Sequence, residues 1–225
     1  TGFHTHFATG QEENDYCREH HGTTAIPQLE KMGFLEYPII AAHSIGIPVE
    51  DLPIVADKPF SVCFAPSSGM RNAAGIAPLD KIREAGVNVA LGTDNVTNNN
   101  SYDMFKEMAL TGKVMSLLKL DAAAIPTRYI LDMATMGGAR AIGKEKEIGS
   151  LESGKKADLI ALDLNEIGWA PFGGQDFYAA LVYAVSGYHV RDVMVNGQWV
   201  VRERRHALEE SSAEEFTTVL RQLLG

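Results

Sequence analysis

Three residues that could bind a metal or move protons each follow a short apolar run. His6 ends "TGFHTH", His43 ends "YPIIAAH" and Asp94 ends "VNVALGTD", and each precedes a loop rich in Gly, Asn or Ser. Two imidazoles and a carboxylate form a ligand set that suits zinc or another divalent first-row metal. Each residue alone is more often an ordinary core histidine or turn aspartate. The repeated pattern leaves a metal site and ordinary packing as the two alternatives.

His4 lies two residues before His6 and therefore has the same parity on an extended strand. Side chains two residues apart point to the same face of a strand. We expect His6 at the rim of that face and His4 one layer deeper. There His4 would either support a metal ligand from behind or pack in the core.

The surrounding elements must bring these groups together. The sequence predicts helices between four short strands, at Gly2–His6, Ile39–His43, Ser61–Ala65 and Val87–Asp94. Strands that alternate with helices predict a parallel sheet with right-handed crossovers. In a parallel α/β barrel the carboxyl ends of the strands form the active face, so His6, His43 and Asp94 are expected to converge there.

The pattern changes near Ile148, where alternating segments and an Asn-Gly pair predict a small antiparallel β-unit. The last segment, "SSAEEFTTVLRQLLG", predicts a helix with Ser212 as its N-cap and Glu215 three residues later. The expected division is a barrel portion over 1–147, a β-segment over 148–208 and a helix over 209–225.

The bulk composition narrows the class of protein. The chain has 225 residues, 45% of them hydrophobic, and a formal charge of -9, which argues against nucleic acid as a partner. No apolar run is long enough for a membrane span, so no membrane partner is expected. Cys17 and Cys63 are too few for a disulfide framework, which fits a reducing cytoplasm. The chain begins at Thr1 inside a predicted strand, as a fragment would.

Several motifs together resemble the amidohydrolase superfamily. They are "HTHFAT", "AAHS", "APSSGMRNAAGIAP" and "GVNVALGTDNVTNNNSYDMFKEM". The similar branch holds the cytosine, guanine and methylthioadenosine/S-adenosylhomocysteine deaminases and the triazine hydrolases such as atrazine chlorohydrolase. The segments "GSLESGKKADLIALDL" and "VRDVMVNGQWVV" resemble the β-sandwich of that family. The resemblance implies an α/β fold, the C-terminal half of a distorted (β/α)8 TIM-type barrel plus part of a small β-sandwich. It also implies a missing N-terminal half of the same chain, which would carry a His-x-His metal pair.

Roles for individual residues follow from the resemblance. His6 and Asp94 would bind a divalent metal, zinc (Zn2+) with iron (Fe2+) as the alternative. Asp94 would also pass a proton from the attacking water to the leaving group, and His43 would hydrogen-bond the developing oxyanion. Thr9, His43 and Phe64 would contact the substrate, and Asn98 or Asn99 would organise the loop around Asp94.

The sequence departs from this branch at two motifs. Thr9 stands where the deaminases carry a glutamate, and a hydroxyl is not a general acid near pH 7. "FAPSSG" replaces "HCPSSN", so Phe64 and Gly69 make a more apolar pocket. Glu12 and Glu13 are nearby in sequence, either as a substitute donor or as part of a solvated loop.

The expected function is hydrolysis of a C–N bond, foremost hydrolytic deamination, in a small N-heterocycle or cyclic amide. A small-molecule heterocyclic substrate is therefore the expected partner, and a homodimer is a further expectation. One alternative is a hydrolase that removes a non-amine leaving group from a triazine-like ring. The alternative from another class is a truncated or inactive relative that lacks the upstream ligands.

Overall fold

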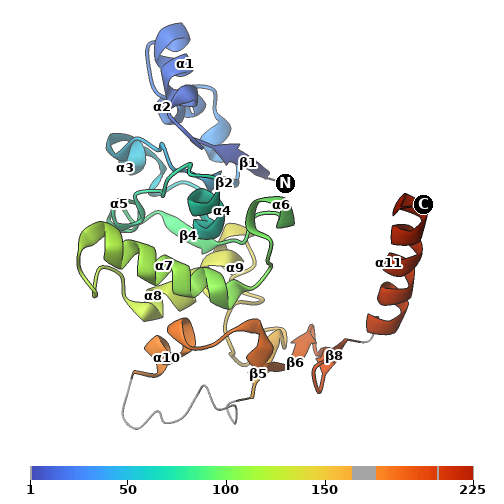
Figure 1. Cartoon of the computed structure of the whole chain (residues 1–225). Coiled ribbons are helices and arrows are strands. Elements are labelled where there is room, and N and C mark those ends of the chain that lie inside the picture. The colour runs from blue at the N-terminus through green and yellow to red at the C-terminus, as the bar shows by residue number, and fades with distance from the viewer. Residues whose placement is uncertain (1, 164–175, 207, 225) are drawn as a thin grey trace.

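A computed structural model describes residues 2–163, 176–206 and 208–224 of the chain, with backbone only for 209–211 (Figure 1). It contains two four-stranded sheets, a parallel one with the order β1-β2-β3-β4 and an antiparallel one with the order β5-β6-β7-β8. The parallel α/β part and the antiparallel β part expected from the sequence are both present.

The parallel sheet carries the candidate residues. Its strands are β1 (Phe3–Phe7), β2 (Ile39–His43), β3 (Phe60–Phe64) and β4 (Asn88–Leu91). In register, His6 lies opposite Ala42, which lies opposite Cys63. All four predicted strands exist, but β4 ends at Leu91, so Asp94 lies on the loop that follows. The strands run the same way, and their carboxyl ends therefore share one edge of the sheet.

Strand β1 forms one side edge of this sheet. Residues Phe3 to His6 are exposed, whereas β2 contains no exposed residue and β3 is mostly buried. Strand β4 lies at the other edge, but it is mostly buried because the helical segment 133–141 packs against it.

Helices connect the strands and cover the sheet. Between β1 and β2 lie α1 (Glu12–His21), α2 (Ala25–Lys31) and the 3-10 turn η1 (Phe34–Glu36). Between β2 and β4 lie η2 (Val49–Asp51), α3 (Leu52–Val55), α4 (Pro66–Arg71) and α5 (Leu79–Glu84). After β4 come α6 (Val96–Asn99), α7 (Met104–Lys119), α8 (Thr127–Asp132), η3 (Met133–Gly137) and α9 (Gly138–Ala141).

Three local expectations differ from the structure. The polar segment after β1 forms the helix α1, which lacks an apolar stripe but places Glu12 and Asp15 in its first turn and Arg18 in its last, as the helix dipole favours. The "NVTNNN" run forms the short helix α6 instead of a loop. The last helix, α11 (Glu209–Leu224), begins at Glu209, so Ser212 is not its N-cap, and the Ser212 backbone amide already bonds to the carbonyl of Leu208.

The apolar core lies between the parallel sheet and its helices. Val62 and Val89 from the strands pack with Ile82, Met115 and other buried residues of the helices. Helix α10 (Phe177–Tyr183) packs against α7 and α8, which links the part after residue 176 to the same core. Gly112 of α7 makes this close approach possible, since a Cβ there would lie 2.2 Å from the Tyr183 hydroxyl oxygen.

The antiparallel sheet consists of β5 (Leu159–Leu162), β6 (Val190–Val195), β7 (Gln198–Arg202) and β8 (Arg205–His206), with the 3-10 turn η5 (Gly187–His189) before β6. Asn196 and Gly197 join β6 to β7 with φ of 50° and 79°. Positive φ at both positions is typical of the tight hairpin turn that an Asn-Gly pair favours, and this prediction is confirmed. No helix in the described part of the chain is both long enough and apolar enough to cross a membrane.

Candidate functional site

The structure brings His6, His43 and Asp94 to one cavity at the carboxyl edge of the parallel sheet. This cavity has a volume of about 680 Å³, and His4, Cys63 and Asn95 also line it. Each of the three residues comes from a different strand end: His6 from β1, His43 from β2 and Asp94 from the loop after β4. Their convergence depends on the parallel arrangement, because antiparallel neighbours would place alternate ends at opposite edges.

The three side chains lie close enough to act on one small molecule. The rings of His6 and His43 stack with centroids 5.3 Å apart and an angle of 24° between their planes. The Nε2 atom of His43 lies 4.0 Å from Oδ2 of Asp94, and the two side chains are 11% and 12% exposed. His6 is exposed at the edge strand. His43 and Asp94 thus form a nearly buried imidazole–carboxylate pair, and the exposed His6 ring stacks on His43.

The backbone at two of these positions adopts an uncommon conformation. His43 has φ of 72°, the next residue, Ser44, has φ of 53°, and Asp94 has φ of 59°. Left-handed backbone at non-glycine residues costs on the order of 1 kcal/mol or more and gathers at functional sites. The Ser44 amide donates a 3.0 Å hydrogen bond to the carbonyl of Phe7, which fixes the turn after β2 against β1.

The Asp94 carboxylate is held by three hydrogen bonds. Oδ2 accepts from the Ser68 hydroxyl at 2.5 Å and from Asn98 Nδ2 at 3.2 Å, and Oδ1 accepts from the Asn95 amide at 2.6 Å. Burial by itself would raise the pKa of Asp94, but these donors and His43 bring the pKa below its ordinary value. Asp94 is therefore an ionised acceptor at neutral pH.

Two further groups of the cavity, the His43 imidazole and the Cys63 thiol, are neutral at the same pH. Burial lowers the pKa of His43 below its ordinary value, with Asp94 opposing and His6 adding to this effect. Burial, reinforced by Asp94, raises the pKa of the Cys63 thiol to about 11. His43 can therefore donate one hydrogen bond and accept another, and Cys63 keeps its proton.

The donor chemistry fits a divalent metal, but the described residues supply too few donors for a complete site. Imidazole nitrogen from His6 and carboxylate oxygen from Asp94 are ordinary zinc donors. Within residues 2–163, 176–206 and 208–224, no group of three or more His, Cys, Asp or Glu side chains is arranged to hold a metal ion. Catalytic zinc sites commonly use three protein ligands, so His6 and Asp94 by themselves would not complete such a site.

Two predicted substrate contacts lie outside the cavity wall. Thr9 is half-buried beyond a sharp turn at Ala8, whose φ is 45°, and it does not line the cavity. Phe64 is 1% exposed and lies with His43 around a separate void of about 10 Å³, too small for a ligand. Both assignments stay predictions.

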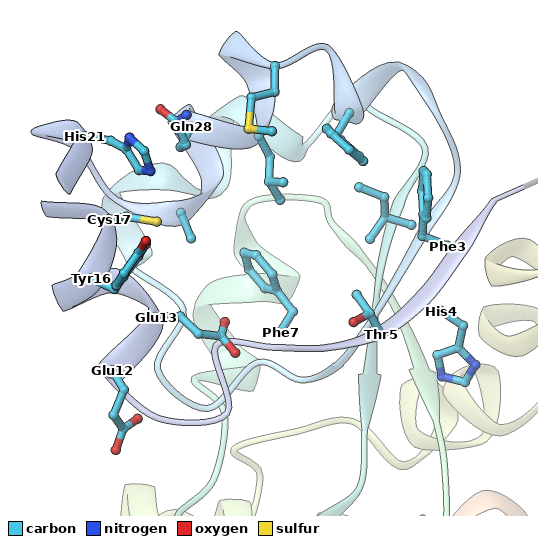
Figure 2. Close-up of a pocket in the computed structure, with 15 residues that line it drawn as sticks. Phe3, His4, Thr5, Phe7, Glu12, Glu13, Tyr16, Cys17, His21 and Gln28 are labelled. Carbon is cyan, nitrogen blue, oxygen red and sulfur yellow. The ribbon is translucent and has the colours of Figure 1, made fainter.

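A larger cavity lies beside β1, between that strand and helices α1 and α2. Its volume is about 870 Å³, and its wall is mainly apolar, with Phe3, Phe7 and Met32 among its residues. Figure 2 shows Phe3 and Phe7 directed into this cavity, while the His4 imidazole points away from it. His6, His43 and Asp94 do not line this cavity, so its size does not make it the site of chemistry.

The neighbouring glutamates belong to this second cavity. Glu12 and Glu13 both line it (Figure 2). The Glu13 carboxylate accepts a hydrogen bond from the Ala8 amide. Glu13 therefore stabilises the turn after β1. Neither glutamate lines the cavity around Asp94, so the structure does not place a substitute for the absent glutamate there.

The sequence predicted a role for Asn98 or Asn99 around Asp94, but it did not identify every residue that supports this loop. Asn98 bonds to Asp94, and Asn99 Nδ2 donates at 2.7 Å to the carbonyl of Thr93, so both organise this loop. Ser68 and the buried Glu107 were not identified. The double serine in "APSSG", placed directly after a buried strand, was the available signal for Ser68.

Comparisons with known proteins agree with one another. The model of the amidohydrolase family matches residues 1–200. The chain is 40% identical over 197 residues to 5-methylthioadenosine/S-adenosylhomocysteine deaminase of Moorella thermoacetica, covering 88% of this chain and 46% of that protein. The protein of the same name from Caldanaerobacter subterraneus subsp. tengcongensis is 38% identical over 204 residues, with 91% and 47% covered. The chain thus spans about half the length of the curated relatives it matches.

Solved structures show the same relationship. An adenosine deaminase from Xanthomonas campestris with bound zinc superposes with a TM-score of 0.88 at 29% identity, covering 99% of this chain and 51% of that one. Atrazine chlorohydrolase from Arthrobacter aurescens TC1, complexed with zinc, gives a TM-score of 0.85 at 26% identity, with 96% and 48% covered.

Proposed function

The chain belongs to the amidohydrolase family, and on this basis we propose that it forms part of a metal-dependent hydrolase that deaminates a small N-heterocycle. The observation that carries the proposal is the convergence of His6, His43 and Asp94 on one cavity. Its volume of about 680 Å³ lies within the range of small-molecule sites. The names of the curated relatives point to adenine-containing nucleosides and thioethers as the first substrates to test.

The chain's own residues have distinct parts in this reaction. His6 and Asp94 would hold the metal, Zn2+ foremost and Fe2+ as the alternative. A divalent metal at such a position lowers the pKa of a ligated water from about 15.7 to near 7 and so supplies hydroxide at neutral pH. Asp94, kept ionised by its three hydrogen bonds, accepts the proton of the attacking water and returns it to the departing amine. Neutral His43 donates a hydrogen bond to the oxyanion that develops on the substrate.

The four parallel strands would form one half of a (β/α)8 barrel, and β5 to β8 would form part of a β-sandwich. In this proposal residues 1–147 are the barrel portion, 148–208 the sandwich segment and 209–225 a terminal helix. An upstream part of the same polypeptide would cover β1 and supply a His-x-His strand to the metal. Three observations support it. β1 is an exposed edge with an apolar cavity beside it, the described residues hold no group of three or more potential metal ligands, and the relatives are about twice as long.

The experiment is a substrate screen of the full-length polypeptide loaded with zinc. Aminated purines, pyrimidines, pterins and triazines would be incubated with the protein, and released ammonia would be measured alongside bound metal. We expect ammonia from adenine-containing compounds and about one equivalent of zinc. Chloride release from chlorotriazines without ammonia release would instead support a hydrolase of a non-amine leaving group. If no compound gave a product, the alternative of an inactive relative would be supported. The cytoplasmic location and the homodimer stay predictions.

A further inference from the structure

Glu107 is a fully buried carboxyl group to which the proposed reaction assigns no role. It lies on α7 and is 0% exposed. A buried carboxyl group is tolerated only where hydrogen bonds replace water. Glu107 has three such bonds: Oε1 accepts from the Ser67 hydroxyl at 2.5 Å and from Asn99 Nδ2 at 2.9 Å, and Oε2 accepts from the Ser67 amide at 3.1 Å.

The partners of Glu107 belong to α4 and α6, the short helices at the start of the two loops that follow β3 and β4 and surround Asp94. Ser67 lies in α4, directly after β3, and the next residue, Ser68, donates its hydroxyl to Asp94. Asn99 lies in α6, after β4, and the preceding residue, Asn98, donates its amide to the same carboxylate oxygen. Glu107 and Asp94 are thus joined by two relays, each made of two residues that are adjacent in the chain.

We propose that Glu107 is a positioning residue that holds Asp94 in its reactive place through the relays Ser67–Ser68 and Asn99–Asn98. The role of Asp94 in this inference rests on the function proposed above. Glu107 itself touches no substrate. Its neighbours on α7, Phe105 and Met108, are buried in the core. The hydrogen bonds of Glu107 therefore attach the two loops around Asp94 to a well-packed helix.

Asp94 needs such support because it lies on a loop and not within strand β4. Strand β4 ends at Leu91, and Asp94 follows on a loop with φ of 59°, a conformation that the strand ladder does not enforce. A proton-transfer group must stay within hydrogen-bond reach of its partner, and a displacement of about 1 Å can cost on the order of 100-fold in rate. Asn99 strengthens the second relay, because its Nδ2 group also bonds to the carbonyl of Thr93, the residue before Asp94.

Substitution of Glu107 by glutamine tests this role with little change in volume. Glutamine has one oxygen, whereas Glu107 accepts all three bonds through two, so at least one donor of Ser67 or Asn99 loses its acceptor. Asp51→Asn is the matched control. Asp51 is also buried and accepts a hydroxyl bond, from Thr24, but this bond involves neither of the loops around Asp94.

The kinetic experiment uses the full-length polypeptide. Glu107→Gln is expected to lower kcat about 10- to 100-fold and to weaken zinc binding by a similar factor, with KM changed less than threefold. Asp51→Asn is expected to keep both kcat and zinc affinity within about threefold of the parent. The same Glu107 substitution is also made in a Ser68→Ala/Asn98→Ala background, in which both relays are already cut. There it should lower kcat less than threefold further, since coupled residues are not additive.

Crystal structures of the parent and of Glu107→Gln supply a readout that needs neither activity nor metal. We expect the Asp94 carboxylate to lose its bond to Ser68 or Asn98 in the variant. If Glu107→Gln does not fold, Ser67→Ala removes the hydroxyl of one relay and is expected to displace Asp94 in the same sense. A parent protein without hydrolase activity would refute the proposed function, while the crystal structures would still decide the positioning role. That role is overturned if Asp94 stays bonded to Ser68 and Asn98 in the variant. It is also overturned if Glu107→Gln lowers kcat as much in the Ser68→Ala/Asn98→Ala background as in the parent.

Discussion

His43 and Asp94, 51 residues apart in the sequence, lie with Nε2 and Oδ2 separated by 4.0 Å in a cavity where both side chains are nearly buried. One carries a neutral ring and the other an ionised carboxylate at neutral pH, as the directions of their pKa shifts indicate. A hydrogen-bond donor and a proton acceptor therefore face the same small volume. This division of roles leads to separate predictions for the two residues.

Asp94→Asn is expected to lower kcat of the full-length enzyme by about 10²- to 10⁴-fold, because an amide cannot accept the proton of the attacking water. The side chain keeps its shape, and Oδ1 can still accept the Asn95 amide, so the circular dichroism spectrum should not change. Steady-state kinetics beside thermal melting would check both points. Near-normal turnover in this variant would refute the proton-transfer role.

His43→Asn is expected to lower kcat about 10²- to 10³-fold through loss of a donor to the oxyanion. Asparagine is chosen because it tolerates the left-handed backbone that His43 adopts, with φ of 72°, better than most residues. The matched control is His20→Asn on the exposed side of α1. Equal activity of both variants would show that His43 only packs against His6.

His6→Ala is expected to reduce the zinc bound by the full-length protein, whereas His4→Ala should leave zinc content near that of the parent. The two histidines are a matched pair, since both lie on β1 and line the same cavity. Metal analysis after dialysis against buffer without zinc would compare them. Equal zinc loss in both variants, or in neither, would contradict the assignment of His6 as the ligand.

The positions of His6, His43 and Asp94 could be expected from the sequence because each ends an apolar run, and parallel strands share one edge. The relays around Asp94 could not be expected in the same way. Glu107 and Ser67 are 40 residues apart, and the spacing of α7 residues alone does not show that a glutamate on that helix is buried. The helix α1 was missed for a related reason, since its polar residues lack the apolar period that marks a packed helix.

Thr9 stands where the deaminases of the similar branch carry a glutamate, and it does not line the cavity around Asp94. The residue before it, Ala8, has φ of 45°, and the residue type alanine does not signal such left-handed backbone in a sequence. Contact between Thr9 and a substrate stays a prediction.

Packing between α7 and α10 gives a prediction that is independent of any activity. Gly112→Ala is expected to lower the stability of the full-length protein by about 1–3 kcal/mol, because the new Cβ would overlap the Tyr183 ring and force the two helices apart. Gly138→Ala in α9 is the matched control: nothing lies within 4 Å of a Cβ there, so the better helix propensity of alanine should raise stability by about 0.5–1 kcal/mol. Thermal melting of both variants measures the difference. A Gly112→Ala protein as stable as Gly138→Ala would contradict the close contact between Gly112 and the Tyr183 ring.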